Sequence, residues 1–163
     1  EIIFADTGEK TLKGGRIKRV EKYIESDLFH LTYGDGVSDL NMKNLVEFHE
    51  SHNCTGTVTA VHPPSRFGEL NLNGDIVLDF EEKPQMHIGY INGGFFVFDK
   101  KIFSYLQGNE DCDFEFGPLQ QISQEGQLRA FRHNGFWQCM DNIRERDYLS
   151  ELATSNNAPW IKW

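Results

Sequence analysis

The sequence predicts an α/β domain built on a mixed, mostly parallel sheet with an inserted β-hairpin. Two observations predict this class. Apolar or β-branched segments of strand length alternate along the chain with segments of helical periodicity, as in βαβ units. Between them lies Asn73-Gly74, a dipeptide preferred in tight hairpins. No repeat or long linker divides the 163 residues, so we expect one domain over residues 1–163.

The first half of the chain alternates between expected strands and helices. In order, these are a short strand at residues 2–4, a helix at 16–24, a buried strand at 27–33, a helix after Asp39 and a β-branched strand at 55–61. The strand at 27–33 ends at Gly34-Asp35-Gly36, a turn sequence. Asp39 is expected to cap the next helix, whose apolar face contains Met42, Leu45, Val46 and His49.

The second half continues the alternation after the hairpin, which joins residues 69–72 to residues 76–80. Pro118 is expected to open a helix, because the first helical position needs no N–H donor. Residues 154–163 are expected to form an irregular aromatic tail. The other expected elements are a strand ending at 95–98, a short helix through Ile102 and Leu106, a strand at 128–131 and a helix at 142–153 with Tyr148, Leu149 and Leu152 facing inward.

Composition excludes several classes of protein. The net charge of −9 argues against a protein that mainly neutralises nucleic-acid phosphates, so we expect no nucleic-acid partner. No segment approaches the roughly 20 apolar residues of a membrane span, and the first residues lack the basic start of a signal peptide. We therefore expect no membrane partner and a cytoplasmic location. Cys54, Cys112 and Cys139 form no C-x-x-C pair, which indicates reduced thiols.

A basic cluster surrounds Gly14-Gly15 despite the acidic composition. Within ten residues the chain carries Lys10, Lys13, Arg16, Lys18 and Arg19. This cluster could bind an anionic small molecule, or it could be a solvated loop and helix end.

Two aspartates are candidate metal ligands. Asp35 lies between two glycines at the carboxyl end of an expected strand, where α/β sheets bind ligands. Asp141 follows an aromatic stretch and precedes a helix. Mg²⁺ is typically held by one or two carboxylates and by substrate phosphates. The alternatives are an ordinary turn for Asp35 and a helix N-cap for Asp141.

Two further segments offer groups suited to a sugar phosphate. Glu82-Lys83-Pro84 supplies a carboxylate and an ammonium, and Asn92-Gly93-Gly94 supplies an amide beside glycines that allow close approach. A charged turn and a glycine bulge in a strand are the structural alternatives.

The order and the amino-acid sequences of these segments resemble those of a known family. The segments that carry the resemblance are TLKGGRIKRV, LTYGDGVSDL, PPSRFGEL, FEEKP, INGGFFVF, GFWQCMDNIRERDYL and APWIKW. From about Asp6 to Trp163 they resemble the bacterial glucose-1-phosphate cytidylyltransferases of the sugar-phosphate nucleotidyltransferase family. The resemblance implies a Rossmann-like, homo-oligomeric enzyme that uses Mg²⁺ to join CTP and glucose 1-phosphate. The products are pyrophosphate and CDP-glucose, a precursor for surface polysaccharides.

The resemblance also implies a set of site residues. It gives Asp35 and Asp141 as metal ligands, Thr11, Arg16 and Gly34 as nucleotide-binding residues, and Glu82, Lys83, Asn92 and Gly93 as sugar-binding residues. Lys83, Arg16 and Asp35 would act in catalysis. Phosphoryl chemistry needs positioning and charge neutralisation more than it needs an acid or a base, which agrees with these residue types.

One family feature is absent from the sequence. The family pattern begins with a glycine-rich GG-x-GTRL loop and an essential lysine that cradle the triphosphate, and neither occurs here. The resemblance therefore implies that the first βα units are missing and that the isolated chain is inactive. The alternatives are a truncated, non-catalytic module that binds a sugar phosphate or a partner, and a uridylyl- or thymidylyltransferase.

Overall fold

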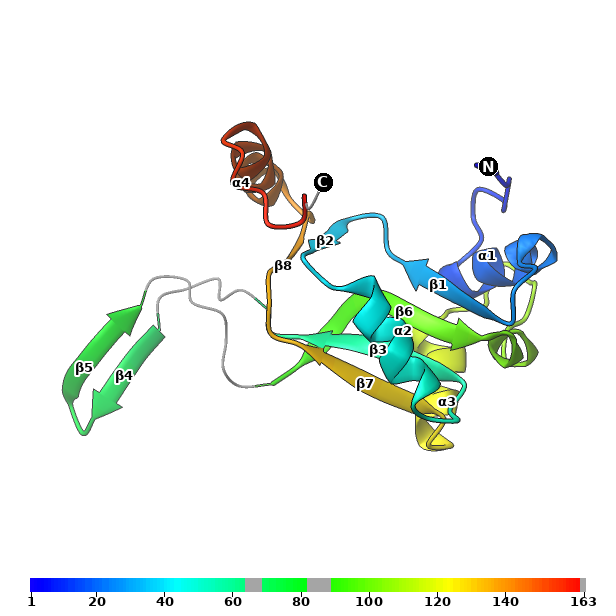
Figure 1. Ribbon diagram of the computed structural model, residues 1–163, viewed down its shortest axis with the longest axis horizontal. Helices are drawn as coiled ribbons and strands as arrows, with labels where there is room; N and C mark the ends of the chain where they lie inside the picture. Colours follow the sequence, from blue (N-terminus) through cyan, green and yellow to red (C-terminus); the bar gives the residue numbers. More distant parts are fainter. Residues whose placement is uncertain (64–68, 82–88, 162–163) are drawn as a thin grey trace. The chain divides into compact units, whose positions relative to one another are not determined.

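The computed structural model describes residues 1–63, 69–81 and 89–161. Within residues 69–81, side chains are described only for residues 73–79. A four-stranded sheet has the order β1-β6-β3-β7, and two further antiparallel pairs are β2-β8 and β4-β5 (Figure 1). The predicted α/β class with a mixed sheet is confirmed. The elements are α1 (Lys13–Val20), η1 (Glu21–Tyr23), β1 (Leu28–Thr32), β2 (Gly36–Ser38), α2 (Met42–Glu50), β3 (Gly56–Val61), β4 (Glu69–Asn73), β5 (Ile76–Glu81), β6 (Ile91–Asp99), η2 (Lys100–Ser104), η3 (Glu115–Leu119), α3 (Gln120–Gln124), β7 (Leu128–His133), β8 (Trp137–Cys139) and α4 (Ile143–Thr154).

The chain divides into two compact units, each made of three segments. Unit 1 contains residues 1–32, 42–58 and 95–131, and unit 2 contains residues 33–41, 59–94 and 132–163. The boundaries fall inside β3, β6 and β7, so these strands contribute residues to both units. The expectation of a single domain stays a prediction.

Aromatic side chains form the core of unit 1. Strand β6 pairs antiparallel with β1, from Leu28 opposite Asp99 to Thr32 opposite Phe95. Alternation along β6 puts Phe96 and Phe98 on one face of the sheet. Both rings meet Phe114 at centroid distances of 5.8 and 5.9 Å. All three side chains are almost fully buried, so this face holds the unit together by packing.

Helix α2 packs on the β3 and β7 side of unit 1 (Figure 1). Leu45 and His49 are its buried residues. The His49 ring lies 2.9 Å from the Thr57 hydroxyl of β3, measured from Nδ1 to Oγ1. The Phe48 and Phe131 rings meet edge to face at 5.4 Å. Met42, predicted to lie on the same face, is 39% exposed, since it is the first residue of the helix.

Two predictions at the start of the chain are wrong. Residues 2–4 form no strand, and Ile2 and Phe4 are highly exposed, because a strand needs partners for its backbone N–H and C=O groups. The first helix begins at Lys13 and includes both glycines. A Cβ on Gly14 would lie 2.7 Å from Cys112 Sγ, so only glycine fits this close approach.

Two predicted helix starts also differ. Helix α2 begins at Met42, and Asp39 instead pairs with His133. Pro118 lies inside the π-helical turn η3 and does not open a helix. An α-helix would need the missing N–H of Pro118 to reach Phe114 O, and the N–H of Leu119 donates to that oxygen at 2.9 Å.

The predicted hairpin is confirmed as β4 and β5, with a shift of one residue at its loop. Asn73 pairs with Ile76, so the two-residue loop is Gly74-Asp75 and not Asn73-Gly74. Gly74 has φ +60°, which glycine adopts without strain. Glycine at the first loop position is typical of a type II′ turn.

Helix α4 and the described residues that follow it belong to unit 2. Helix α4 buries Leu149, whereas Tyr148 is 45% exposed, so only part of the predicted inward face is buried. In the expected aromatic tail, Trp160 stacks on Phe136 at a centroid distance of 5.5 Å.

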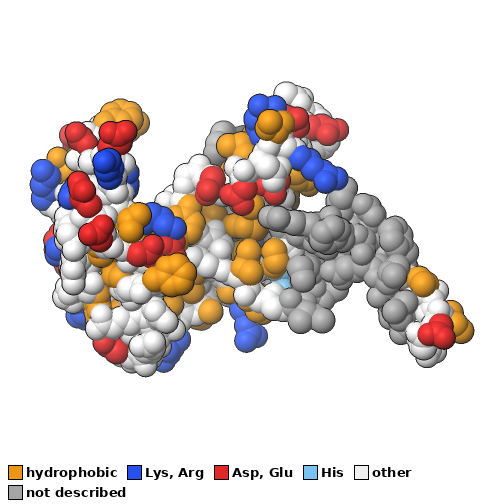
Figure 2. All heavy atoms as spheres, turned by 180° about the vertical axis from the view of Figure 1, so that it is seen from behind, with side chains coloured by type: hydrophobic (Ala, Val, Ile, Leu, Met, Phe, Trp, Pro, Cys, Tyr) orange, Lys and Arg blue, Asp and Glu red, His pale blue; other side chains and the backbone are white. Residues whose placement is uncertain are grey.

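The described surface is mixed in charge. On the face drawn in Figure 2, Lys and Arg side chains lie in small groups beside Asp and Glu. Among the described residues, the helices are all too short or too polar to cross a membrane.

Candidate active site at the β2 and β8 pair

The pairing of β2 with β8 brings the two predicted metal ligands to the same end of a short ladder. Gly36 is opposite Cys139, and the N–H of Met140 donates to Asp35 O at 2.8 Å. The register therefore continues for one residue beyond the strands. Asp35 lies opposite Met140, and Asp141 is the next residue along. Residues distant in sequence thus become neighbours through backbone hydrogen bonds.

Asp141 belongs to a small cluster of candidate metal-binding side chains. Ligand atoms of Cys139, Asp141 and Glu145 all lie within 4.8 Å of one another. Cys139 Sγ donates to Asp141 Oδ2 at 3.4 Å. Burial, followed by this hydrogen bond, raises the pKa of the Cys139 thiol to about 11. The N-cap of α4 is Asn142, so the alternative role of Asp141 as the N-cap is wrong.

The predicted sugar-binding segment joins the same unit through Tyr33. Asn92 Nδ2 donates to the Tyr33 hydroxyl at 3.2 Å, and Tyr33 N donates to Gly94 O at 3.1 Å. Trp137 Nε1 donates to Gly93 O at 2.8 Å. Hydrogen bonds therefore connect Asn92 and Gly93 to the residue before Gly34 and to the first residue of β8.

Gly34 and Gly93 differ in their surroundings. A Cβ on Gly93 would lie 2.8 Å from Val61 Cγ1 and 3.0 Å from Thr59 O, so glycine is required there by packing. A Cβ on Gly34 would meet nothing within 4 Å. The backbone at Gly34 is thus open to an approaching group.

The predicted nucleotide-binding residues Thr11 and Arg16 lie in unit 1, and the other described site residues lie in unit 2. Thr11 is 3% exposed, and its hydroxyl accepts a hydrogen bond from Arg19 Nη1 at 2.8 Å. Arg16 donates to Thr7 Oγ1 at 2.9 Å and to Glu9 O at 3.0 Å. Both side chains therefore hold the segment before α1. The roles predicted for Glu82 and Lys83 concern residues outside the described ranges.

Sequence reasoning missed a polar cluster at the Ser38 end of the β2 and β8 pair. His133 Nε2 lies 2.9 Å from Asp39 Oδ1 and 3.1 Å from Ser38 Oγ. The Ser38 hydroxyl donates to Phe136 O at 2.8 Å. Serine, histidine and aspartate suggest a nucleophilic triad, but one ring nitrogen faces both partners, whereas a triad uses both nitrogens. The cluster fixes the loop before β8.

Sequence reasoning also missed an aromatic stack in unit 2. The His62 and Tyr90 rings lie 4.1 Å apart, and the Arg132 guanidinium lies 5.6 Å from the centre of the Tyr90 ring. The three residues flank or belong to β3, β6 and β7, and only the folded sheet brings them together.

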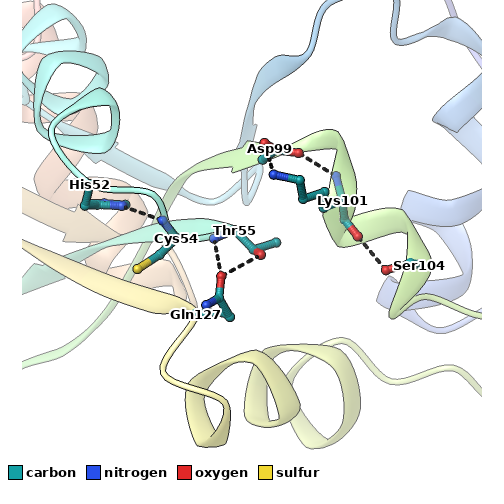
Figure 3. A network of polar contacts seen from close by, with 7 residues as sticks. All are labelled: His52, Cys54, Thr55, Asp99, Lys101, Ser104 and Gln127. Carbon is teal, nitrogen blue, oxygen red and sulfur yellow. Dashed lines mark hydrogen bonds and ion pairs between the residues drawn. The ribbon is translucent and has the colours of Figure 1, made fainter.

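A different polar network lies in unit 1 at the start of β3 (Figure 3). Gln127 Oε1 accepts hydrogen bonds from the N–H and the hydroxyl of Thr55 at 3.3 and 3.2 Å. Cys54 N donates to His52 Nδ1 at 3.2 Å, so His52 carries its proton on Nε2, the nitrogen 2.9 Å from Thr57 Oγ1. The Thr57 hydroxyl can then donate to His49 Nδ1. This chain of hydrogen bonds requires neutral imidazoles.

Comparison with known proteins identifies the family. The nucleotidyl transferase family profile matches residues 9–141. A glucose-1-phosphate cytidylyltransferase of Salmonella typhimurium is 42% identical over 163 residues, which are 99% of this chain and 63% of the relative. A mannose-1-phosphate guanylyltransferase catalytic subunit beta of Dictyostelium discoideum is 31% identical over 140 residues, covering 82% of this chain and 38% of the relative. The chain thus spans less than two thirds of these relatives.

Solved structures share the fold at low sequence identity. HddC of Yersinia pseudotuberculosis, complexed with GMP-PN, has a TM-score of 0.61 and 24% identity over 91% of this chain and 64% of its own. The inositol-1-phosphate CTP transferase of T. maritima has a TM-score of 0.57 and 18% identity over 83% of this chain and 58% of its own.

Proposed function

Because this chain belongs to the nucleotidyl transferase family, we propose that it contributes to cytidylyl transfer from CTP to glucose 1-phosphate. Pyrophosphate and CDP-glucose are the products, and the chain acts together with the part of the longer relatives that it does not span. The observation that carries the proposal is the β2 and β8 pairing, which puts Asp35 opposite Met140, the residue before Asp141. The 42% identity to the Salmonella enzyme favours CTP and glucose 1-phosphate over other substrate pairs.

The donor set fits Mg²⁺. Asp35 and Asp141 offer carboxylate oxygens, the ligands that Mg²⁺ prefers. When bound, Mg²⁺ would neutralise charge on the reacting phosphates.

In the proposed reaction, a phosphate oxygen of glucose 1-phosphate attacks the α-phosphorus of CTP. A new P–O bond forms while the bond from the α-phosphorus to the bridging oxygen breaks, and pyrophosphate leaves with that electron pair. Gly34 lets the substrates approach the backbone beside Asp35. Asn92 and Gly93 bind the sugar together with Glu82 and Lys83. Thr11 and Arg16 bind the nucleotide, and Lys83 and Arg16 also act in catalysis. Positioning and charge neutralisation supply the catalysis.

Metal-dependent binding tests the proposal. Calorimetry with Mg²⁺, CTP and glucose 1-phosphate should give heats that Asp35→Asn and Asp141→Asn abolish. Asp147→Asn is a matched control, because Asp147 is exposed and pairs with Arg146. Equal heats in Asp141→Asn and the wild type would refute the metal assignment. Stronger binding of UTP or dTTP than of CTP would favour the uridylyl- or thymidylyltransferase alternative.

Turnover separates the remaining alternatives. Pyrophosphate release by the 163-residue chain alone would contradict the expectation that it is inactive in isolation. Binding of glucose 1-phosphate without turnover, even when the part of the Salmonella relative that this chain does not span is supplied, would favour the non-catalytic module.

The cellular compartment and the oligomeric state of the protein are further parts of the proposed function. We place the reaction in the cytoplasm, with its product as a polysaccharide precursor. We also propose a homo-oligomer, which the resemblance of the sequence to its family implies. Light scattering checks this, and a monomeric mass at high concentration would contradict it.

A further inference from the structure

Helix α4 begins with a capping box that is displaced by one residue. Asn142 Oδ1 accepts the N–H of Glu145 at 3.1 Å, as an N-cap does. In the usual box, the acidic side chain reaches back to the N–H of the N-cap residue. Here Glu145 Oε2 accepts the N–H of Asp141 at 2.7 Å. The carboxylate of Glu145 therefore fixes the backbone of the residue before the cap.

Asp141 is held from the other side as well. Cys139 belongs to β8 and pairs with Gly36 of β2. Its thiol contacts Asp141 Oδ2 at 3.4 Å, which leaves Oδ1 for another ligand. The backbone N–H and one carboxylate oxygen of Asp141 thus each have a partner, one in α4 and one in β8.

We propose that Glu145 is a positioning residue for Asp141, the metal ligand of the proposed function on which this inference rests. Its hydrogen bond to Asp141 N fixes where the Asp141 carboxylate projects between the end of β8 and the start of α4. Residues that orient metal ligands typically change metal affinity by about 10- to 100-fold when they are removed.

Mn²⁺ alone, titrated into the 163-residue chain and followed by electron paramagnetic resonance, tests this role. Glu145→Ala should weaken Mn²⁺ binding by roughly tenfold. Glu145→Gln keeps an acceptor oxygen and should restore affinity close to that of the wild type. Asn142→Ala is the matched control, because it removes the other half of the capping box. It should lower the thermal midpoint as Glu145→Ala does, while leaving Mn²⁺ affinity unchanged.

Two results would overturn the positioning role. The first is wild-type Mn²⁺ affinity in Glu145→Ala. The second is an equal loss of affinity in Glu145→Ala and Asn142→Ala, because fraying of α4 would then explain both. Failure of the proposed function looks different: Asp141→Asn would bind Mn²⁺ as the wild type does.

Discussion

The two units of this protein hold their key residues in different ways. In unit 1, Phe96, Phe98 and Phe114 are at most 1% exposed and contact one another through their rings. In unit 2, Asp35, Gly93 and Asp141 are held by hydrogen bonds from or to their backbone. A change of volume in a packed core costs stability, whereas hydrogen bonds to the backbone of Asp35 and Asp141 leave carboxylate oxygen for a ligand. Stability and site geometry should therefore respond to different substitutions.

The largest effect should come from the aromatic core of unit 1. Phe98→Ala removes a buried ring that contacts Phe29, Phe96 and Phe114, and should cost about 3–5 kcal/mol of the free energy of unfolding in urea. Phe116→Ala is the control, because Phe116 is 86% exposed and should change little. Similar losses in both variants would contradict the packing account of unit 1.

The next effect should come from a glycine of unit 2. Gly93→Ala forces a Cβ against Thr59 O and Val61, so it should cost about 2–3 kcal/mol by thermal or urea unfolding. Gly34→Ala has open space and should leave stability unchanged while weakening binding of Mg²⁺-CTP or glucose 1-phosphate. If Gly34→Ala lost stability and Gly93→Ala did not, the assignment of Gly34 to a ligand would be wrong.

Removing a buried hydroxyl in unit 1 should lower the free energy of unfolding by less than Phe98→Ala or Gly93→Ala does. Thr57 is fully buried between His49 and His52, so Thr57→Val leaves ring nitrogens without a partner at a cost of about 1–2 kcal/mol in urea unfolding. Thr154→Val changes an exposed threonine at the end of α4 and serves as the control. No difference between the two variants would show that the hydroxyl is dispensable.

The smallest effect should be on the pH dependence of stability. Burial is the main cause that lowers the pKa of His49 and His52 below 6.5 in the folded chain. Between the lowered pKa and 6.5, the unfolded chain binds more protons than the folded chain. The stability that the neutral histidines contribute is therefore complete above pH 6.5 and is lost as the pH falls below that value. Urea unfolding at a series of pH values measures the slope. His52→Gln should reduce the slope of the free energy of unfolding against pH. An unchanged slope would show that His52 does not contribute to this pH dependence.

Local chemistry determined much of the fold from the sequence. The strands near residues 27–33, 55–61 and 128–131 and the β4-β5 hairpin follow from apolar, β-branched and turn residues, and all are present. The expected strand at residues 2–4 and the helix starts at Asp39 and Pro118 are absent, because each depended on partners that only tertiary contacts supply.

By itself, the sequence determined the α/β class, the order of most elements and the candidate ligands Asp35 and Asp141, because turn chemistry and hydrophobic periodicity are local properties. Only the tertiary structure decided that β2 pairs with β8 and that Gly93 is enclosed while Gly34 is open. These relations join residues up to about a hundred positions apart. Such pairings are fixed by the packing and hydrogen bonding of the whole chain and not by any one segment.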